Sequence, residues 1–174
     1  MATLNDTKTE TIEESGTAAI EKFRELVEDI PVAMFITSSG DGWLDGRPMG
    51  AQELDDDGAL WFFTDKRTGK VAELQADAKT SVSYVDSKKA TYVFARGITT
   101  VIDDKAKAEE LWSAPMNAWF EGADDPNLVL LRVDVDTVEF WNDPAGGLVS
   151  ILRVGAKALG ANVSQGEMGH LEPS

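Results

Sequence analysis

The first apolar positions along the chain recur at helical spacing. Ala19, Ile20, Phe23, Leu26, Val27 and Ile30 follow one another at steps of three and four, with charged residues between them. This spacing places the apolar side chains on one face of an amphipathic helix. Pro31 follows, and the residue before a proline is disfavoured in helical geometry. The pattern therefore predicts a helix that ends at Pro31.

Short apolar runs separated by turn residues come next. The turn sequences Ser-Gly-Asp-Gly at 39–42 and Asp-Asp-Asp-Gly at 55–58 are typical of hairpins. The apolar runs cover residues 32–36, 43–54, 60–63, 81–85, 90–102, 127–135 and 138–141. Successive hairpins predict five to seven short strands in an antiparallel sheet that closes as a small barrel, an α+β fold.

Helical segments are predicted around this sheet. A short helix begins near Thr68, and a second, which Asp103 and Asp104 cap, ends near Trp112. A further helical piece carries Met116, Trp119 and Phe120, and a last helix spans about 148–159. Polar composition predicts flexible tails at 1–15 and 161–174, which leaves one domain over 16–160.

Composition removes several classes of function. The chain has 16 Lys and Arg against 31 Asp and Glu, a net charge of −15, with no Cys and a single His, His170. These counts exclude disulfides, thiolate chemistry and multi-histidine metal sites, so no metal site is expected. The acidity argues against nucleic acid and anionic membranes as partners. Without an apolar run of about 20 residues or a secretory signal, the expectation is a soluble cytoplasmic protein.

One basic segment stands out against this acidic background. Lys66, Arg67 and Lys70 fall within five positions, accompanied by Thr64, Thr68 and Gly69, where a helix is predicted to begin. Cationic side chains, hydroxyls and free N–H groups at a helix start together favour an anion, most naturally a phosphate. The alternative is a solvated basic loop, and the spacing alone does not choose between the two.

Two further features are candidates for ligand contact. The stretch Arg47-Pro48-Met49-Gly50-Ala51-Gln52 lies on a strand predicted to pair with residues 60–64. Alternation along this strand would turn some of its side chains toward the basic segment. The alternative is ordinary alternation that leaves Arg47 exposed to solvent. Trp141 is the best candidate for stacking on a planar ligand, whereas aromatic residues also fill cores and dimer interfaces. The acidic residues Glu53 and 55–57 are expected to form a solvated hairpin tip.

Taken in order, these motifs resemble those of the flavin-binding split-barrel proteins related to pyridoxamine 5′-phosphate oxidase, and within them the bacterial general stress proteins. The resemblance covers about residues 18–160. It depends on the joint order of several segments rather than on one of them. They are Arg47-Pro48-Met49, residues 60–64, residues 68–74, Leu111-Trp112, residues 118–120, residues 130–133 and Glu139-Phe140-Trp141.

The resemblance implies a six-stranded split barrel that forms a homodimer with FMN at the subunit interface. Arg47, Thr68 and Lys70 would bind the phosphate, and Pro48, Met49, Phe63 and Thr64 would line the ribityl chain and the ring. Gln52 and Gly69 stand where the oxidase has a Lys and an Arg, and Arg67 would compensate in part. The oxidase's C-terminal Arg/His substrate motif is absent after Trp141, so pyridoxamine phosphate is not expected as substrate.

Three hypotheses about function follow. The first is a flavin-dependent oxidoreductase acting on an unidentified small molecule, in which the flavin supplies the chemistry. The second is a flavin-binding stress protein without turnover, which buffers FMN or FAD. The third is a dimeric protein whose flavin groove is vestigial.

Overall fold

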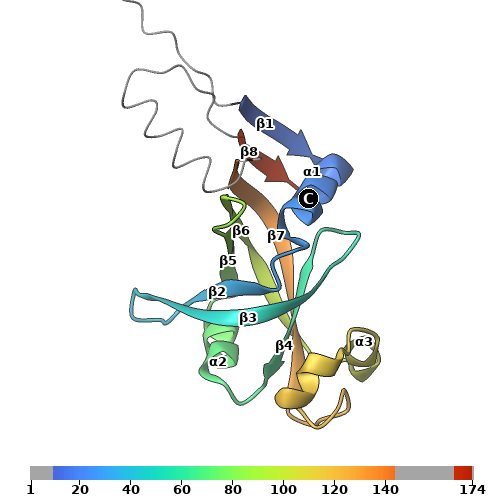
Figure 1. Cartoon of the computed structure of the whole chain (residues 1–174). Coiled ribbons are helices and arrows are strands. Elements are labelled where there is room, and N and C mark those ends of the chain that lie inside the picture. The colour runs from blue at the N-terminus through green and yellow to red at the C-terminus, as the bar shows by residue number, and fades with distance from the viewer. Residues whose placement is uncertain (1–9, 144–166, 174) are drawn as a thin grey trace, which may run out of the picture.

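Six antiparallel strands form a closed barrel (Figure 1). The computed structural model describes residues 10–143 and 167–173. The barrel strands are β2 (Val32–Ser38), β3 (Leu44–Leu54), β4 (Leu60–Asp65), β5 (Lys79–Asp86), β6 (Thr91–Ile102) and β7 (Leu128–Asn142). They pair in the order β7-β4-β3-β2-β5-β6, and β6 pairs again with β7 to complete the ring. The predicted α+β barrel of six strands is confirmed.

The longest strand, β7, was predicted as two short strands, at 127–135 and 138–141, and this division is wrong. Arg96 of β6 pairs with Thr137 and Gly97 pairs with Val135, so Asp136 is an extra residue on β7. A bulge of this kind interrupts the alternation of buried and exposed residues without ending the strand. At the bulge, a Cβ on Gly97 would lie 2.1 Å from the Asp134 carbonyl oxygen. Glycine therefore allows the two backbones to approach there.

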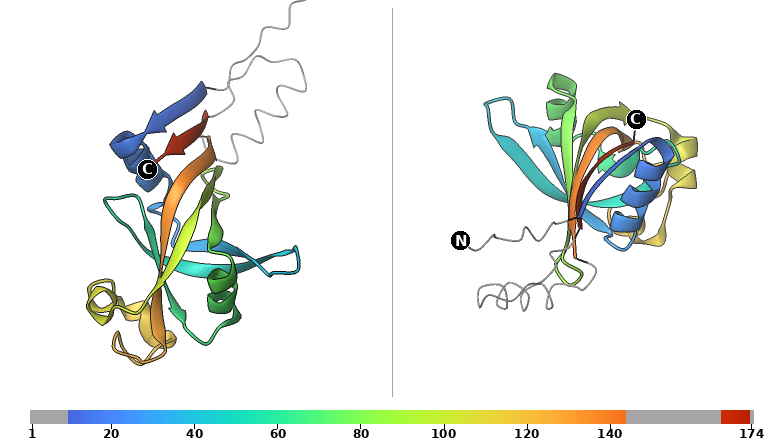
Figure 2. Two further views of the ribbon diagram at one scale, coloured as in Figure 1. Left: turned by 180° about the vertical axis from the view of Figure 1, so that it is seen from behind. Right: turned by 90° about the horizontal axis from the view of Figure 1, so that it is seen from above.

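Within the described residues, three α-helices and a 3-10 helix lie around the barrel: α1 (Gly16–Val27), α2 (Gly69–Ala76), α3 (Lys105–Glu110) and η1 (Ala114–Ala118). The helix starts predicted near Thr68 and at Asp104 are confirmed, since Asp104 accepts hydrogen bonds from the backbone N–H groups of Ala106 and Lys107. The apolar face of α1 joins the barrel core, where Phe23 meets Tyr84 edge-on with ring centroids 6.4 Å apart. Figures 1 and 2 show α1 toward one end of the barrel and α3 toward the other.

Both predicted tails contain a strand. β1 (Glu10–Ser15) pairs in parallel with β8 (Glu167–Glu172), and β8 pairs antiparallel with β7, so the sheet extends to eight strands. Leu171 of β8 is fully buried in the main core. These segments are polar and short, so their own sequence carries little β signal, and β1 depends on a partner at the other end of the chain.

Only one of two remaining expectations can be compared with the described part of the chain. The helix predicted over 148–159 lies outside the described residues. Within 10–143 and 167–173, no helix combines the length and the apolar character that crossing a membrane requires.

Replacing Tyr84 with Phe is expected to leave the free energy of unfolding unchanged or to raise it by up to about 1 kcal/mol. The Tyr84 hydroxyl is buried and has no hydrogen-bond partner among the described residues, so its desolvation is uncompensated. Burial likewise raises the pKa of this phenol. Urea denaturation measures the change. The matched control is Thr99→Val, because the buried Thr99 hydroxyl donates to Thr80 at 2.7 Å, and its removal should cost about 1 kcal/mol. A clear loss of stability in Y84F would show that the hydroxyl has a partner.

Candidate functional site

An ion pair between a barrel strand and a helix forms the centre of the candidate site. Arg47 lies on β3 opposite Phe35 of β2, on the face of the strand that turns toward the barrel interior. Its Nη1 donates to Thr37 Oγ1 at 2.8 Å, and its Nη2 donates to Glu73 Oε2 of α2 at 2.9 Å. The Arg47 and Glu73 side chains are only 24% and 19% exposed. Arg47 is therefore held in a partly buried position, and the alternative of a solvated arginine is wrong.

Lys70 lies in the first turn of the same helix. Its Nζ donates to Thr64 Oγ1 at 2.7 Å, and the Thr64 and Thr68 hydroxyls lie 3.5 Å apart. Thr68 precedes α2, and its hydroxyl donates to the Asp65 carbonyl at 2.8 Å. A Cβ on Gly69 would meet only Glu73 Oε1, at 3.7 Å. The first turn of α2 thus combines a cation, two hydroxyls, an open glycine and the positive end of a helix dipole, which is the donor set of an anion site.

The electrostatics show that the two cations act on each other. Burial lowers the pKa of Lys70, and the positive charge of Arg47 lowers it further. The hydrogen bond from Thr37 and the Arg47 guanidinium hold the pKa of the Glu73 carboxyl below its ordinary value. Two like charges in one partly desolvated region are costly unless anionic groups compensate them. A bound phosphate would supply that compensation.

The other basic residues of the segment point to different partners. The exposed Arg67 binds Asp65 through Nε at 3.0 Å and through Nη2 at 2.5 Å. This contact lowers the pKa of Asp65 to about 2. Lys66 is exposed, and its backbone N–H donates to the Asn127 carbonyl. The structure therefore brings Arg47, Thr64, Thr68 and Lys70 together and leaves Arg67 in a separate ion pair with Asp65.

The predicted ring-lining residues divide between two faces. Met49 and Phe63 are 8% and 7% exposed. Phe63 lies against Trp112, with ring centroids 5.8 Å apart. Pro48 points outward, opposite Met34 of β2. Their side chains are thus distributed over both sides of the sheet.

Gln52 lies on β3 and Trp141 lies on β7. Gln52 is the extra residue where the register of β3 against β4 shifts, and its Nε2 donates to the Gly50 carbonyl at 3.0 Å. Trp141 is 45% exposed and pairs across the outer face of the sheet with Tyr92 on one side and Met168 on the other. Neither residue contacts the group formed by Arg47, Thr64, Thr68 and Lys70, which is called the Arg47–Lys70 group below.

Sequence reasoning missed Glu73 and Thr37. Glu73 follows Lys70 by three positions, a spacing that puts both side chains on one side of a helix. Thr37 alternates with Ala33 and Phe35 on the inward face of β2. The helix spacing was a usable signal for Glu73, whereas the approach of Thr37 depends on how β2 lies beneath α2.

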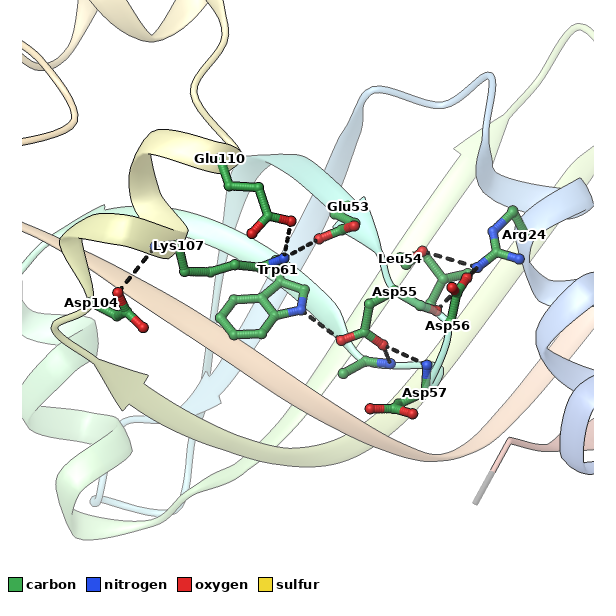
Figure 3. Close-up of polar contacts among 11 residues, drawn as sticks. Arg24, Glu53, Leu54, Asp55, Asp56, Asp57, Trp61, Asp104, Lys107 and Glu110 are labelled. Carbon is green, nitrogen blue, oxygen red and sulfur yellow. Dashed lines mark hydrogen bonds and ion pairs between the residues drawn. The ribbon is translucent and has the colours of Figure 1, made fainter.

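The prediction of a solvated hairpin tip holds for Asp56 and Asp57, which are exposed, whereas Glu53 and Asp55 are partly buried and held by specific contacts (Figure 3). Asp55 accepts hydrogen bonds from the Ala59 backbone N–H at 2.8 Å and from Trp61 Nε1 at 2.8 Å. Lys107 of α3 lies 5.2 Å from the Trp61 ring centroid and binds Glu53 at 3.0 Å. These contacts attach α3 to the barrel. Within the described residues, no group of three or more acidic or histidine side chains is arranged to hold a metal ion.

Comparisons with known proteins identify the family and the fold. The sequence matches the family described as pyridoxamine 5′-phosphate oxidase like over residues 18–165. General stress protein 26 of Bacillus subtilis (strain 168) is 26% identical over 82 residues, which are 45% of this chain and 59% of that protein. The chain thus spans less than two thirds of this curated relative.

Two solved structures share the fold over most of their length. The general stress FMN/FAD binding protein of Xanthomonas citri is 32% identical, with a TM-score of 0.60 over 72% of this chain and 89% of that chain. A Jannaschia sp. CCS1 protein, provisionally named general stress protein 26, is 28% identical. Its TM-score is 0.67 over 90% of this chain and 99% of that chain.

Replacing Glu73 with Gln is expected to lower the free energy of unfolding by about 1 kcal/mol near neutral pH. Because folding lowers the pKa of Glu73 below its ordinary 4.5, the ionised carboxylate stabilises the fold above that pH. This contribution is lost as the pH falls below 4.5 and through the lowered pKa, so the stabilities of wild type and E73Q should converge in that acidic range. Urea denaturation at several pH values measures the difference. The control Glu21→Gln, on the exposed side of α1, should show no such trend, and a pH-independent deficit in E73Q would contradict the assignment.

Proposed function

The chain belongs to the pyridoxamine 5′-phosphate oxidase-like family, and from that premise we propose that it is a flavin-binding stress protein whose phosphate site is the Arg47–Lys70 group. The observation that carries this proposal is a pair of partly buried cations, Arg47 on β3 and Lys70 in the first turn of α2, together with the hydroxyls of Thr64 and Thr68 beside Lys70. The ligand is a flavin nucleotide, with FMN as the first expectation and FAD as the alternative. The FMN/FAD binding relative from Xanthomonas citri supports this choice.

In this proposal each residue has a physical role toward the flavin. Arg47 and Lys70 neutralise the phosphate, and the first-turn N–H groups of α2 donate to its oxygens. The backbone at Met49 and Phe63 would line the route from the phosphate to the ring, because the two side chains lie in different cores on opposite faces of the sheet. When bound, the flavin would supply electron transfer, and the chain would orient the ring and limit access of water.

The activity that this arrangement supports is oxidoreduction of a small molecule. Anaerobic addition of NADH or NADPH to the flavin-loaded protein, followed by reoxidation with candidate acceptors, tests it. Reduction of the flavin band with turnover supports an enzyme. Binding without reduction by any donor supports flavin buffering instead.

We also propose that the chain forms a homodimer through the outer face of the barrel. Val85, Tyr92, Trp141 and Met168 are at least 36% exposed and lie in register across β5, β6, β7 and β8. Val32, Met34 and Pro48 extend this apolar band onto β2 and β3. Soluble monomers rarely expose an apolar patch that is continuous over so many strands. In the dimer Trp141 would lie at the interface, where the flavin is expected.

Replacing Lys70 with Ala is expected to weaken FMN binding roughly 10- to 100-fold, because a hydrogen bond to a charged group contributes about 1.5–3 kcal/mol. Riboflavin, which lacks the phosphate, should bind wild type and K70A equally. Quenching of flavin fluorescence on titration measures both ligands.

Two controls make this test specific. Arg67→Ala should change FMN affinity far less, because Arg67 is bound to Asp65. Lys88→Ala removes an exposed lysine in the turn between β5 and β6 and should have no effect. Equal affinity of wild type and K70A for FMN would show that the phosphate lies elsewhere.

Replacing Val85 with Glu is expected to convert a dimer into a monomer, since it buries a charge at the centre of the apolar band. Sedimentation velocity at several protein concentrations measures the change. Trp119→Glu is the control, because Trp119 is 79% exposed near η1 and lies outside the band. A monomeric wild-type protein, or a dimer that V85E leaves intact, would contradict the proposed interface.

A further inference from the structure

The anion site contains a carboxylate that is fixed in place. Glu73 Oε2 lies 2.9 Å from Arg47 Nη2, and the same oxygen accepts the Thr37 hydroxyl. Thr37 is 1% exposed, so this hydroxyl is an internal anchor rather than a solvent-facing group. Glu73 thus stays beside the guanidinium that is proposed to meet the flavin phosphate.

The contacts of Glu73 leave Arg47 able to bind a second anion. A guanidinium has five N–H donors, and Thr37 and Glu73 each accept from one Nη atom. The remaining donors can face a ligand while the first two keep the plane of the group fixed. Glu73 therefore orients Arg47 without occupying all of it.

The carboxylate also sets the charge of the site. Arg47 and Lys70 contribute two positive charges and Glu73 one negative charge, which leaves one positive charge. Asp45 is 3.9 Å from Arg47, but its side chain is 54% exposed and water screens it. Arg67 and Asp65 neutralise each other. A phosphate that enters this site meets less positive charge than its two cations imply.

We propose that Glu73 is a specificity-determining residue that selects against doubly charged phosphate, and so lowers the affinity for FMN more than the affinity for FAD. The terminal phosphate of FMN carries nearly two negative charges above its second pKa of about 6. The pyrophosphate of FAD carries one negative charge on each phosphorus, and only one of them can lie beside Arg47. Repulsion from Glu73 therefore costs FMN more. This inference depends on the proposed flavin function.

The test uses the full chain and the variant Glu73→Gln, which removes the charge and keeps an oxygen to accept from Arg47. Titrations with FMN, FAD and riboflavin are run at pH 8 and low ionic strength. FMN should bind E73Q roughly tenfold more tightly than wild type, FAD roughly threefold more tightly, and riboflavin equally well. The FMN gain should shrink in 0.5 M salt because the added ions screen it.

Two further variants separate charge from structure. Glu21→Gln makes the same change in net charge on the exposed side of α1 and should leave all three affinities unchanged. Glu73→Ala removes both the charge and the hydrogen-bond acceptor that supports Arg47. Its increase in FMN affinity over wild type should therefore be smaller than that of E73Q. Thermal unfolding confirms that each variant is folded at the titration temperature.

The outcomes distinguish this inference from the proposed function. The selectivity role is overturned, while flavin binding stands, if wild type binds FMN and E73Q binds it no more tightly. The same conclusion follows if E73Q raises the affinities for FMN and FAD by equal factors. If E73Q loses affinity for FMN, Glu73 only positions Arg47. If neither wild type nor E73Q binds any of the three flavins, the proposed function itself fails.

Discussion

The pairing of β6 with β7 is the interaction on which the rest of the structure depends. It runs from Thr91 opposite Asn142 to Ile102 opposite Leu130, and it joins the last strand of the ring to the first. Closure gives β6 a partner on both edges, β5 and β7, which reduces the exposed hydrogen-bonding edge that favours aggregation. It also fixes the direction in which each inward side chain points. The bulge at Asp136, with Gly97 opposite, allows this long pairing to bend around a small core.

The candidate site follows from that closure. Because β4 is held between β3 and β7, the chain that leaves β4 at Asp65 turns directly into α2. That helix presents Glu73 to Thr37 of β2 and Arg47 of β3, and it presents Lys70 to Thr64 of β4. Partial burial makes each of these electrostatic contacts stronger than the same contact would be in water. The site is thus assembled from three consecutive strands and one helix, and it needs no residue from a distant loop.

Part of this arrangement could be predicted from the sequence. Alternation of apolar and polar residues identifies the barrel strands. The sequence around the start of α2 also groups Thr64, Thr68 and Lys70 as a candidate site, and the structure places these three side chains together. The Glu73–Arg47 pair could not be predicted, because it depends on how far α2 tilts over β2 and β3. The strands β1 and β8 could not be predicted either, because they pair with each other across the two ends of the chain and their side chains are mainly polar. Local patterns specify an element only where burial on one face is regular.

The acidity of the chain and its anion site are compatible because they act over different distances. The net charge of −15 belongs mostly to exposed side chains, and salt at physiological strength screens such charges beyond about 8 Å. Arg47 is within hydrogen-bonding distance of Glu73 and is only 24% exposed, so it is screened much less. A phosphate is therefore repelled weakly at long range and held by a few contacts at short range. In the proposed function, retention of a flavin nucleotide would then depend on the balance among Arg47, Lys70 and Glu73 rather than on the charge of the whole protein.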